Sequence, residues 1–315
     1  MNNSLRATAT LLAAGGLLLT ATACSSSDSQ DSAAEPGAQK KISIVASTSI
    51  WADVAQAVAD TASGVDIEVK PIVEGNGVDP HHFEPSAADI AKAEDADLLV
   101  VNGGGYDSWI YQAVSEQDNI ISALPLTDHG KLADDPNVMT IDAAKATAKK
   151  DPKQVTNIEG NEHIWYDPAA LDEVAGNIAD QINELNTDAN ASTERVDSHV
   201  DRLRDKLKEL PGDLSYAQTE PIADYIMKYT SGKDVTPEGY RKATISEGEP
   251  ATADVAAFIK AIDDGEVDLL IFNPQTETDT AEDNTEQSGA EPQQPPTDQQ
   301  RQHHERSSVE RVGDV

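Results

Sequence analysis

Strand-like and helix-like segments alternate along this chain from Lys41 onward, and this alternation is what most limits its fold. Residues 42–46 and 65–73 are rich in the β-branched side chains that favour strands, while residues 50–61 and 86–94 have helical patterns. Strands that alternate with helices form parallel sheets, because the crossover between parallel strands needs a helix. We therefore expect an α/β fold with helices on both faces of each sheet.

A stiff loop with two adjacent histidines follows the second predicted strand. Its sequence is Gly77-Val78-Asp79-Pro80-His81-His82-Phe83-Glu84-Pro85. Each proline fixes its own φ and restricts the residue before it, so the loop has few conformations. Ligands of parallel sheets bind beyond the carboxyl ends of the strands, which is where this loop begins. A stiff loop with imidazoles at that edge is suited to present a metal ligand.

Two later stretches repeat the combination of a metal-binding side chain and a proline. Glu162-His163-Ile164-Trp165-Tyr166-Asp167-Pro168 carries one histidine, and Thr219-Glu220-Pro221 carries a carboxylate at a predicted strand-to-helix junction. Imidazole and carboxylate are ligands that suit Zn²⁺ and Mn²⁺. The three stretches together indicate that distant loops meet around a metal ion.

The order and spacing of these stretches resemble those of the zinc/manganese-binding lipoproteins that serve as solute receptors of metal ABC importers, the cluster A-I family of solute-binding proteins. The resemblance covers residues 41–278. Position by position, it implies that His81, His163 and Glu220 are the metal ligands. The family's fourth ligand, a carboxylate near the C-terminus, has no counterpart here, so we expect this chain to lack the family's C-terminal segment.

The resemblance also implies a domain organisation. Family members have two parallel-sheet lobes with helices on both faces, joined by a long rigid helix, and here we expect the second lobe to be incomplete. The predicted order is a lipoprotein signal peptide (1–23), a flexible tether (24–40), an N-terminal metal-binding lobe (41–186), a connecting helix (187–210, with its mostly polar helical pattern over 190–210), a truncated C-terminal lobe (211–278) and an acidic, Gln-rich tail (279–315).

The predicted tail differs sharply in composition from the rest of the chain. It is rich in Gln, Glu, Thr and Pro and has almost no aliphatic residue before Val309. Such a segment cannot bury enough apolar surface to offset the entropy of ordering it, so we expect it to be disordered. A frameshift after Thr278 and a natural acidic tail both explain it. The abrupt end of the family-like sequence favours the frameshift.

The N-terminus has the pattern of an exported lipoprotein. Residues 7–23 form an apolar run shorter than the ~20 residues that a membrane-spanning helix needs, and the run ends in small residues. Ala21-Thr22-Ala23-Cys24 then resembles a bacterial lipobox, in which Cys24 is lipidated. The alternative is an ordinary secretory signal with an incidental cysteine. Because Cys24 is the only cysteine of the chain, we favour the lipid anchor on the outer face of the bacterial membrane.

Charge and cysteine content exclude several classes of function. The chain has 57 acidic and 23 basic residues and a net charge of −34, which argues against nucleic acid as a partner. A single cysteine leaves neither an internal disulfide nor a thiolate metal cluster. The family resemblance implies that the partners are a divalent metal ion and the permease of an ABC importer, and we expect a monomer.

The expected function is to capture Zn²⁺ or Mn²⁺ between the two lobes outside the cell and to deliver it to that permease. Two alternatives belong to other classes. Two histidines, one glutamate and a water molecule also form the site of zinc hydrolases, although the sequence has no His-Glu-x-x-His motif. A lipid-anchored surface adhesin that needs no metal is the other alternative. On balance we expect a binding protein and no enzyme.

The remaining histidines have no comparable sequence context. We expect His82 to support the site from outside it or to face solvent, since it cannot easily share a face with His81. His129, His199, His303 and His304 are interpreted as ordinary hydrogen-bonded or surface residues. Gly103-Gly104-Gly105 lacks the Lys-Ser/Thr ending of a phosphate loop, and we interpret it as a turn.

Overall fold

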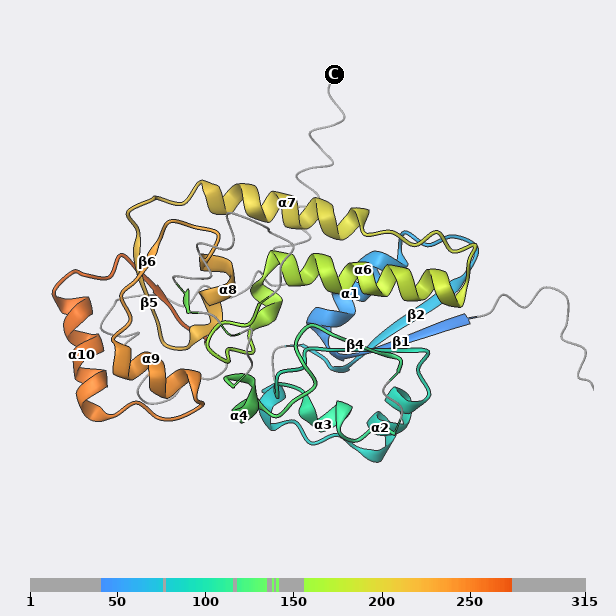
Figure 1. The fold of residues 1–315 in the computed structure, drawn as a ribbon, viewed down its shortest axis with the longest axis horizontal. Helices are drawn as coiled ribbons and strands as arrows, with labels where there is room; N and C mark the ends of the chain where they lie inside the picture. Colours follow the sequence, from blue (N-terminus) through green and yellow to red (C-terminus); the bar gives the residue numbers. More distant parts are fainter. Residues whose placement is uncertain are drawn as a thin grey trace, which may run out of the picture. The chain divides into compact units, whose positions relative to one another are not determined.

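Parallel strands form two separate sheets in the computed structural model (Figure 1). The structure describes residues 41–75, 78–115, 118–134, 138, 140–141 and 156–273. The predicted signal peptide, Cys24, the tether and the predicted tail lie outside these described residues. Within the described part of the chain, no helix is both long and apolar enough to cross a membrane.

The first sheet has the strand order β2-β1-β3-β4, and every pairing in it is parallel. Its strands are β1 (Lys41–Thr48), β2 (Asp66–Val73), β3 (Leu98–Val101) and β4 (Ile120–Ser122). The helices that follow or cover them are α1 (Ser49–Ala59), α2 (Ala87–Glu94), α3 (Ser108–Tyr111), α4 (His129–Leu132), α6 (Pro168–Leu185) and α7 (Glu194–Lys208).

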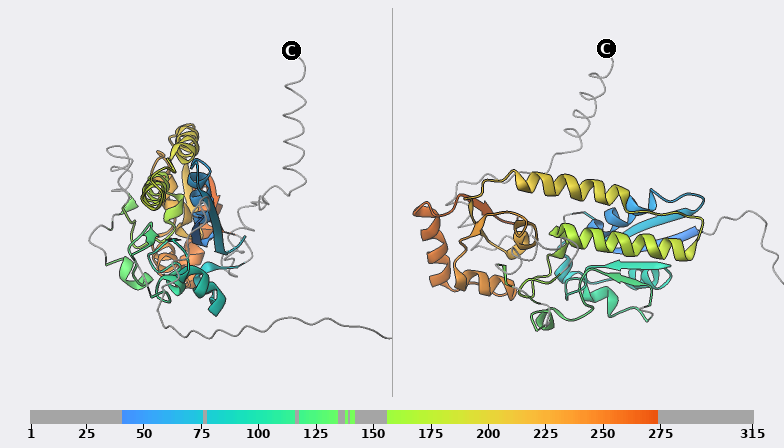
Figure 2. Two further views of the ribbon diagram at one scale, coloured as in Figure 1. Left: turned by 90° about the vertical axis from the view of Figure 1, so that its right-hand side faces the viewer. Right: turned by 45° about the horizontal axis from the view of Figure 1, so that its top comes forward.

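Helices cover both faces of this sheet because successive side chains of a strand point to opposite faces. Ile42, Ile44 and Ala46 of β1 join a core cluster with α1 and α6, whereas Val45, which lies between Ile44 and Ala46, belongs to the cluster on the opposite side. That opposite cluster includes Ile110 of α3 and Ala93 of α2. Turning the molecule shows the two layers of helices with the sheet between them (Figure 2). The predicted α/β fold is thereby confirmed for this sheet.

The second sheet has the strand order β6-β5-β7 and is also parallel. Its strands are β5 (Ser215–Gln218), β6 (Lys233–Asp234) and β7 (Leu269–Ile271), and its helices are α8 (Asp224–Met227), α9 (Glu238–Ile245) and α10 (Thr252–Asp263). Neighbouring side chains of β5 again point to opposite faces of the sheet. Tyr216 packs with Met227 of α8, and Ala217 packs with Tyr240 of α9 and Phe258 of α10.

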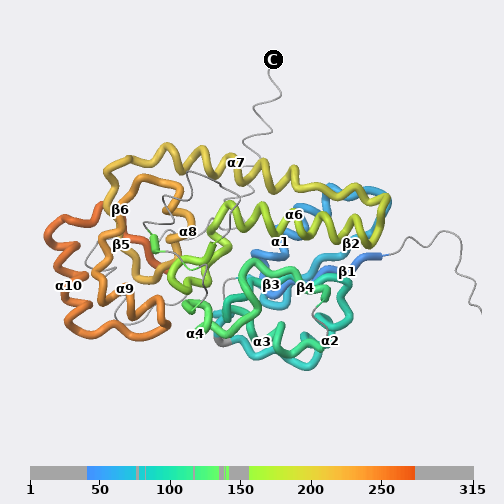
Figure 3. Tube along the Cα trace, in the orientation of Figure 1, coloured from blue at the N-terminus to red at the C-terminus, as the bar shows by residue number. Residues whose placement is uncertain are grey.

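Helix α7 differs from the polar helix predicted over residues 190–210. It begins at Glu194, because Asn190 has a positive φ of 52° that ends any regular helix there. One face is buried, with Val196 and Val200 in the core, and the tube drawing shows α7 running beside α6 (Figure 3). Arg204 of α7 also forms an ion pair of 2.8 Å with Asp172 of α6. One face of this helix is therefore packed along α6.

Side chains cap the first turns of α2 and α6. Ser86 and Asp89 form a reciprocal capping box at the start of α2. Asp167 accepts a hydrogen bond from the backbone N–H of Ala169 and so begins α6 with Pro168 in the first turn. By contrast, α1 begins without a side-chain cap, since Thr48 at its N-cap makes no side-chain hydrogen bond to the first turn.

A buried ion pair joins the start of α6 to the end of α8. The carboxylate of Asp167 is fully buried, and it contacts Nζ of Lys228 and accepts a hydrogen bond of 2.6 Å from the Tyr229 hydroxyl. Removing one partner from a buried pair leaves an unpaired charge away from water, which is far more costly than losing a surface pair. This contact therefore holds the two elements together strongly.

We expect Asp167→Ala to lower the free energy of unfolding by about 3–5 kcal/mol, because Lys228 then stays buried without its counter-charge. Urea unfolding at neutral pH measures the loss. The matched control is Asp60→Ala, which breaks an exposed pair with Arg195 and should cost at most about 1 kcal/mol. Equal losses in the two variants would contradict the assignment.

Candidate metal centre

The loop after β2 presents His81 through a short 3-10 helix, Pro80–His82. Asp79 caps this turn, since its Oδ1 accepts a hydrogen bond of 3.0 Å from the backbone N–H of His81. Trp109 of α3 donates a hydrogen bond of 2.9 Å from Nε1 to the Pro80 carbonyl. The imidazole of His81 packs edge-on against Tyr106, with ring centroids 4.7 Å apart. The proline-stiffened loop is thus held on both sides of its histidine.

The loop before α6 presents His163 in one defined tautomer. The side-chain amide oxygen of Asn161 lies 2.7 Å from Nδ1 of His163 and also accepts a hydrogen bond from its backbone N–H. An amide oxygen only accepts, so Nδ1 carries the proton and Nε2 keeps its lone pair. A neutral imidazole with one nitrogen held in this way is the arrangement found in metal ligands.

Glu162 lies between the two histidines and is almost completely buried. Its backbone carbonyl accepts a hydrogen bond of 2.9 Å from Nδ2 of Asn102, whose Oδ1 in turn accepts one from the Trp51 indole. The Asp107 carboxylate accepts hydrogen bonds from the backbone N–H groups of Asn102 and Gly103. The end of β3 is thereby tied to the loop that carries Glu162.

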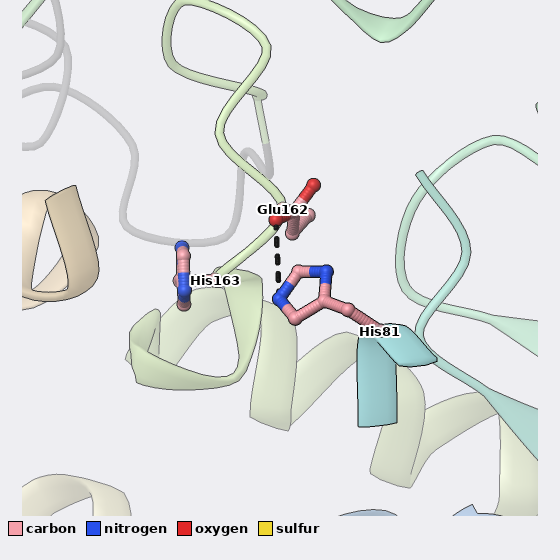
Figure 4. Close-up of side chains that lie close together, drawn as sticks. All are labelled: His81, Glu162 and His163. Carbon is pink, nitrogen blue, oxygen red and sulfur yellow. Dashed lines mark ion pairs between the residues drawn. The ribbon is translucent and has the colours of Figure 1, made fainter. Parts of the chain in front are cut away.

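Figure 4 shows these three side chains close together, with Glu162 paired to His81. Oε1 of Glu162 is 3.5 Å from Nε2 of His81, and ligand atoms of His81, Glu162 and His163 all lie within 4.8 Å of one another. The ring centroids of His81 and His163 are 6.3 Å apart. Two imidazoles and a carboxylate at these distances are arranged to hold a metal ion of the size of Zn²⁺ or Mn²⁺.

The two histidines differ in their electrostatic surroundings. Burial lowers the pKa of His163 to about 3, and the charges of His81 and His129 act in the same direction. Burial also acts to lower the pKa of His81, but the carboxylates of Glu247 and Glu162 outweigh it and raise that pKa above its usual value. His163 is therefore neutral at neutral pH, whereas His81 attracts a cation, either a proton or a metal ion.

Glu220, the third predicted ligand, lies at the end of the second sheet and outside the group of His81, Glu162 and His163. Its Oε2 accepts a hydrogen bond of 3.4 Å from Asn273, and it makes no side-chain bond that caps the following turn. Burial raises the pKa of Glu220 to about 7, and the charge of His81 opposes that rise. The Glu220 carboxyl group therefore interacts electrostatically with His81.

Two residues that the sequence did not single out belong to the same cluster. His129, interpreted as an ordinary histidine, lies at the start of α4 with Nε2 2.8 Å from Oε2 of Glu162. Glu247, which follows α9, contacts both His81 and His129. His129 follows the carboxyl end of β4, which is where ligands of parallel sheets bind. This signal was not used because the three-residue strand β4 was not predicted from the sequence.

The other residues considered from the sequence lie around or away from this cluster. Trp165 packs between Tyr106 and His163, whereas Tyr166 is exposed. His199 is exposed on α7, where its Nδ1 lies 2.8 Å from the Arg195 carbonyl. The side chain of His82 is outside the described part of the structure.

Residues 44–306 match the family model described as zinc-uptake complex component A, periplasmic (ZnuA). The chain belongs to this family. The match continues past Thr278, into residues that the structure does not describe. Members of the ZnuA family are substrate-binding components of metal uptake systems and not enzymes, so the zinc hydrolase alternative is excluded.

Individual relatives support the same assignment. The chain is 27% identical over 249 residues to the metal ABC transporter substrate-binding lipoprotein ScbA of Streptococcus cristatus, covering 74% of this chain and 73% of that protein. It is 24% identical over 217 residues to the manganese ABC transporter substrate-binding lipoprotein PsaA of Streptococcus pneumoniae, covering 67% and 66%.

The fold also occurs in a solved relative of lower identity. The structure of the laminin-binding protein Lmb of Streptococcus agalactiae, described as having adhesin and metal-transporting activity, superposes with a TM-score of 0.54 at 17% identity. The superposed region covers 86% of this chain and 98% of the Lmb chain. At this identity the likeness establishes the fold, two parallel sheets with their helices.

The raised pKa of Glu220 predicts a pH dependence of stability. A carboxyl group that titrates near 7 in the folded protein and near 4.5 in the unfolded chain stabilises the fold fully below about pH 4.5 and loses this effect as the pH rises to 7. In protein freed of metal, we expect Glu220→Gln to flatten this part of the profile. Melting temperatures of both proteins from pH 4.5 to 7.5 test it. Parallel profiles would contradict the prediction.

Proposed function

We propose that this chain captures a divalent transition metal ion outside the cell and delivers it to the permease of an ABC importer. The observation that carries the proposal is the convergence of His81, Glu162 and His163, three metal-binding side chains from two distant loops, within 4.8 Å. Membership of a family of metal-uptake receptors supports the same conclusion independently.

The proposed ligands are His81 and His163, with Glu162 beside them and Glu220 from the second sheet. His163 offers Nε2 because Asn161 holds its other nitrogen. The family resemblance supports Glu220 as a further ligand, and its pKa of about 7 fits a carboxyl group that ionises when a cation arrives. An ion at this position would join loops from both sheets.

Zn²⁺ or Mn²⁺ is the proposed cargo. Imidazole nitrogen suits zinc and carboxylate oxygen suits manganese, and the cluster offers both kinds of atom without sulfur. Both metals occur among the names of the similar proteins, zinc in the family description and manganese in PsaA. Fold similarity to Lmb does not by itself extend its adhesin activity to this chain.

The export route completes the proposal. Lipidation of Cys24 would hold the receptor at the outer face of the membrane, next to its permease, through the tether of residues 24–40. The names of ScbA and PsaA as lipoproteins support this arrangement. We propose that the protein acts there as a monomer.

His81→Ala and His163→Ala should each abolish tight binding of Zn²⁺ and Mn²⁺, because each removes one imidazole from the converging group. Metal content by mass spectrometry after desalting measures the loss. A thermal melt with added metal is a second readout, since an ion at 100 times its Kd stabilises the folded form by about 2.7 kcal/mol.

His199→Ala is the matched control for these two variants, as it removes an exposed histidine far along α7 and should bind metal like the wild type. A wild-type protein that neither retains metal nor melts at a higher temperature with metal would overturn the proposed function.

Cys24→Ser should release the protein from the membrane to the soluble fraction, because the serine cannot be lipidated. Fractionation of cells that express each form, followed by immunoblotting, measures the distribution. If the variant stays in the membrane fraction to the same extent as the wild type, the lipid anchor is refuted.

A further inference from the structure

Two carboxylates in the cluster each divide their oxygens between the same two histidines. Oε1 of Glu162 lies 3.5 Å from Nε2 of His81, and Oε2 of Glu162 lies 2.8 Å from Nε2 of His129. In Glu247, Oε1 is 3.2 Å from Nδ1 of His81 and Oε2 is 3.5 Å from Nδ1 of His129. His81 and His129 are thus bridged twice.

The bridging divides the cluster into two groups that each contain three ligands. Ligand atoms of His129, Glu162 and Glu247 lie within 4.8 Å of one another, as do those of His81, Glu162 and His163. Glu162 is common to both groups. A carboxylate that offers one oxygen to each side is the bridge found between neighbouring metal ions in two-metal sites, which are about 3.5–4 Å apart.

Glu162 is the buried member of the group formed by His129, Glu162 and Glu247. Its side chain is 4% exposed, and Oε2 lies 2.8 Å from Nε2 of His129, which donates to it only when that nitrogen carries a proton. A buried carboxylate oxygen needs a donor or a cation to offset its lost hydration. A metal ion between Glu162 and His129 supplies that compensation.

His129 is placed by tight backbone packing. Gly105 has a φ of 100°, and a Cβ at this position would lie 2.2 Å from the backbone nitrogen of His129. The Tyr111 hydroxyl accepts a hydrogen bond from Gly105 N–H and donates one of 2.6 Å to the Thr127 carbonyl. Only glycine allows this approach, so the turn at Gly103–Gly105 positions the histidine-bearing loop.

Glu247 reaches the cluster from a strained backbone position. It has a φ of 54° just after α9, a place where glycine is usual, because a Cβ is disfavoured in the left-handed region. Its side chain is half-exposed at 49% yet lies between His81 and His129. Strain kept at a residue that contacts two potential ligands suggests a function for the side chain.

We propose that His129, Glu162 and Glu247 form a second divalent cation position, joined through the Glu162 carboxylate to the position of His81 and His163. This inference rests on the proposed function, since it concerns the same cargo. The second position is the more exposed of the two, because Glu247 borders solvent. An ion that binds there first can pass inward by exchanging ligands one at a time without leaving Glu162.

Titration of the full-length, demetallated protein with Zn²⁺ at neutral pH tests the proposal by stoichiometry. The wild type should bind two ions per chain, the second more weakly than the first. His129→Ala and Glu247→Gln should each bind one, with the affinity of that ion changed less than about threefold. His163→Ala should lose the tight ion and keep the weaker one, and the control His199→Ala should bind two.

A spectroscopic measurement separates a bridged pair from two independent sites. Two Mn²⁺ ions that share a carboxylate are magnetically coupled, so the paramagnetic resonance signal of bound Mn²⁺ should broaden when the second equivalent binds. The broadening should be absent in Glu247→Gln, whose half-exposed substitution leaves the core intact.

The outcomes distinguish this inference from the proposed function. A wild type that binds a single ion, or a His129→Ala variant that still binds two, overturns the second position and leaves the receptor function standing. A wild type that binds no ion overturns the receptor function itself. Two ions without broadening of the manganese signal overturn the shared carboxylate.

Discussion

The buried contacts of Asn161 and Asp224 are the constraint on which the metal centre depends. Asn161 donates a hydrogen bond of 3.0 Å to the fully buried carboxylate of Asp224, which Arg241 holds with two nitrogens at 2.7 and 3.0 Å. The Tyr225 hydroxyl donates to the Asn161 carbonyl at 2.6 Å. Two-pronged pairing of a guanidinium with a carboxylate is strong and directional, so the loop two residues before His163 has one position. Helices that pack on the second sheet thereby fix the proposed ligand His163, which lies in the loop before α6.

A second set of buried hydrogen bonds joins Glu162 to the hydrophobic core. Asn102 connects the Trp51 indole, buried under the first sheet, to the backbone of Glu162. The carboxylate between the histidines is therefore held through one amide by a residue of α1. Because the residues that support the proposed ligands are buried, the positions of these ligands are determined before any ion binds. Such preparation reduces the ordering cost of binding.

Sequence patterns predicted the fold and the two histidine loops, but not the whole cluster. Capping at Ser86 and Asp167 and the alternation of strand and helix were visible locally, since they depend on neighbouring residues. Strand β4 and helix α9 were missed, because the first has three residues and the second is polar and contains a glycine. His129 and Glu247 follow those two elements, so their approach to Glu162 was hidden. Their position depends on contacts between distant segments, which no local pattern records.

The fixed tautomer of His163 affects which groups release protons when a metal ion binds. With Nδ1 held by Asn161 and a pKa of about 3, this imidazole has no proton to lose at Nε2 when an ion binds near neutral pH. If His81 and Glu220 bind the cargo as proposed, the protons that it displaces come from His81, whose pKa is raised, and from Glu220, with a pKa of about 7. Capture is then a partial exchange of protons for metal, and its heat depends on the buffer that takes them up. A receptor of this kind holds its cargo less tightly as its surroundings become acidic.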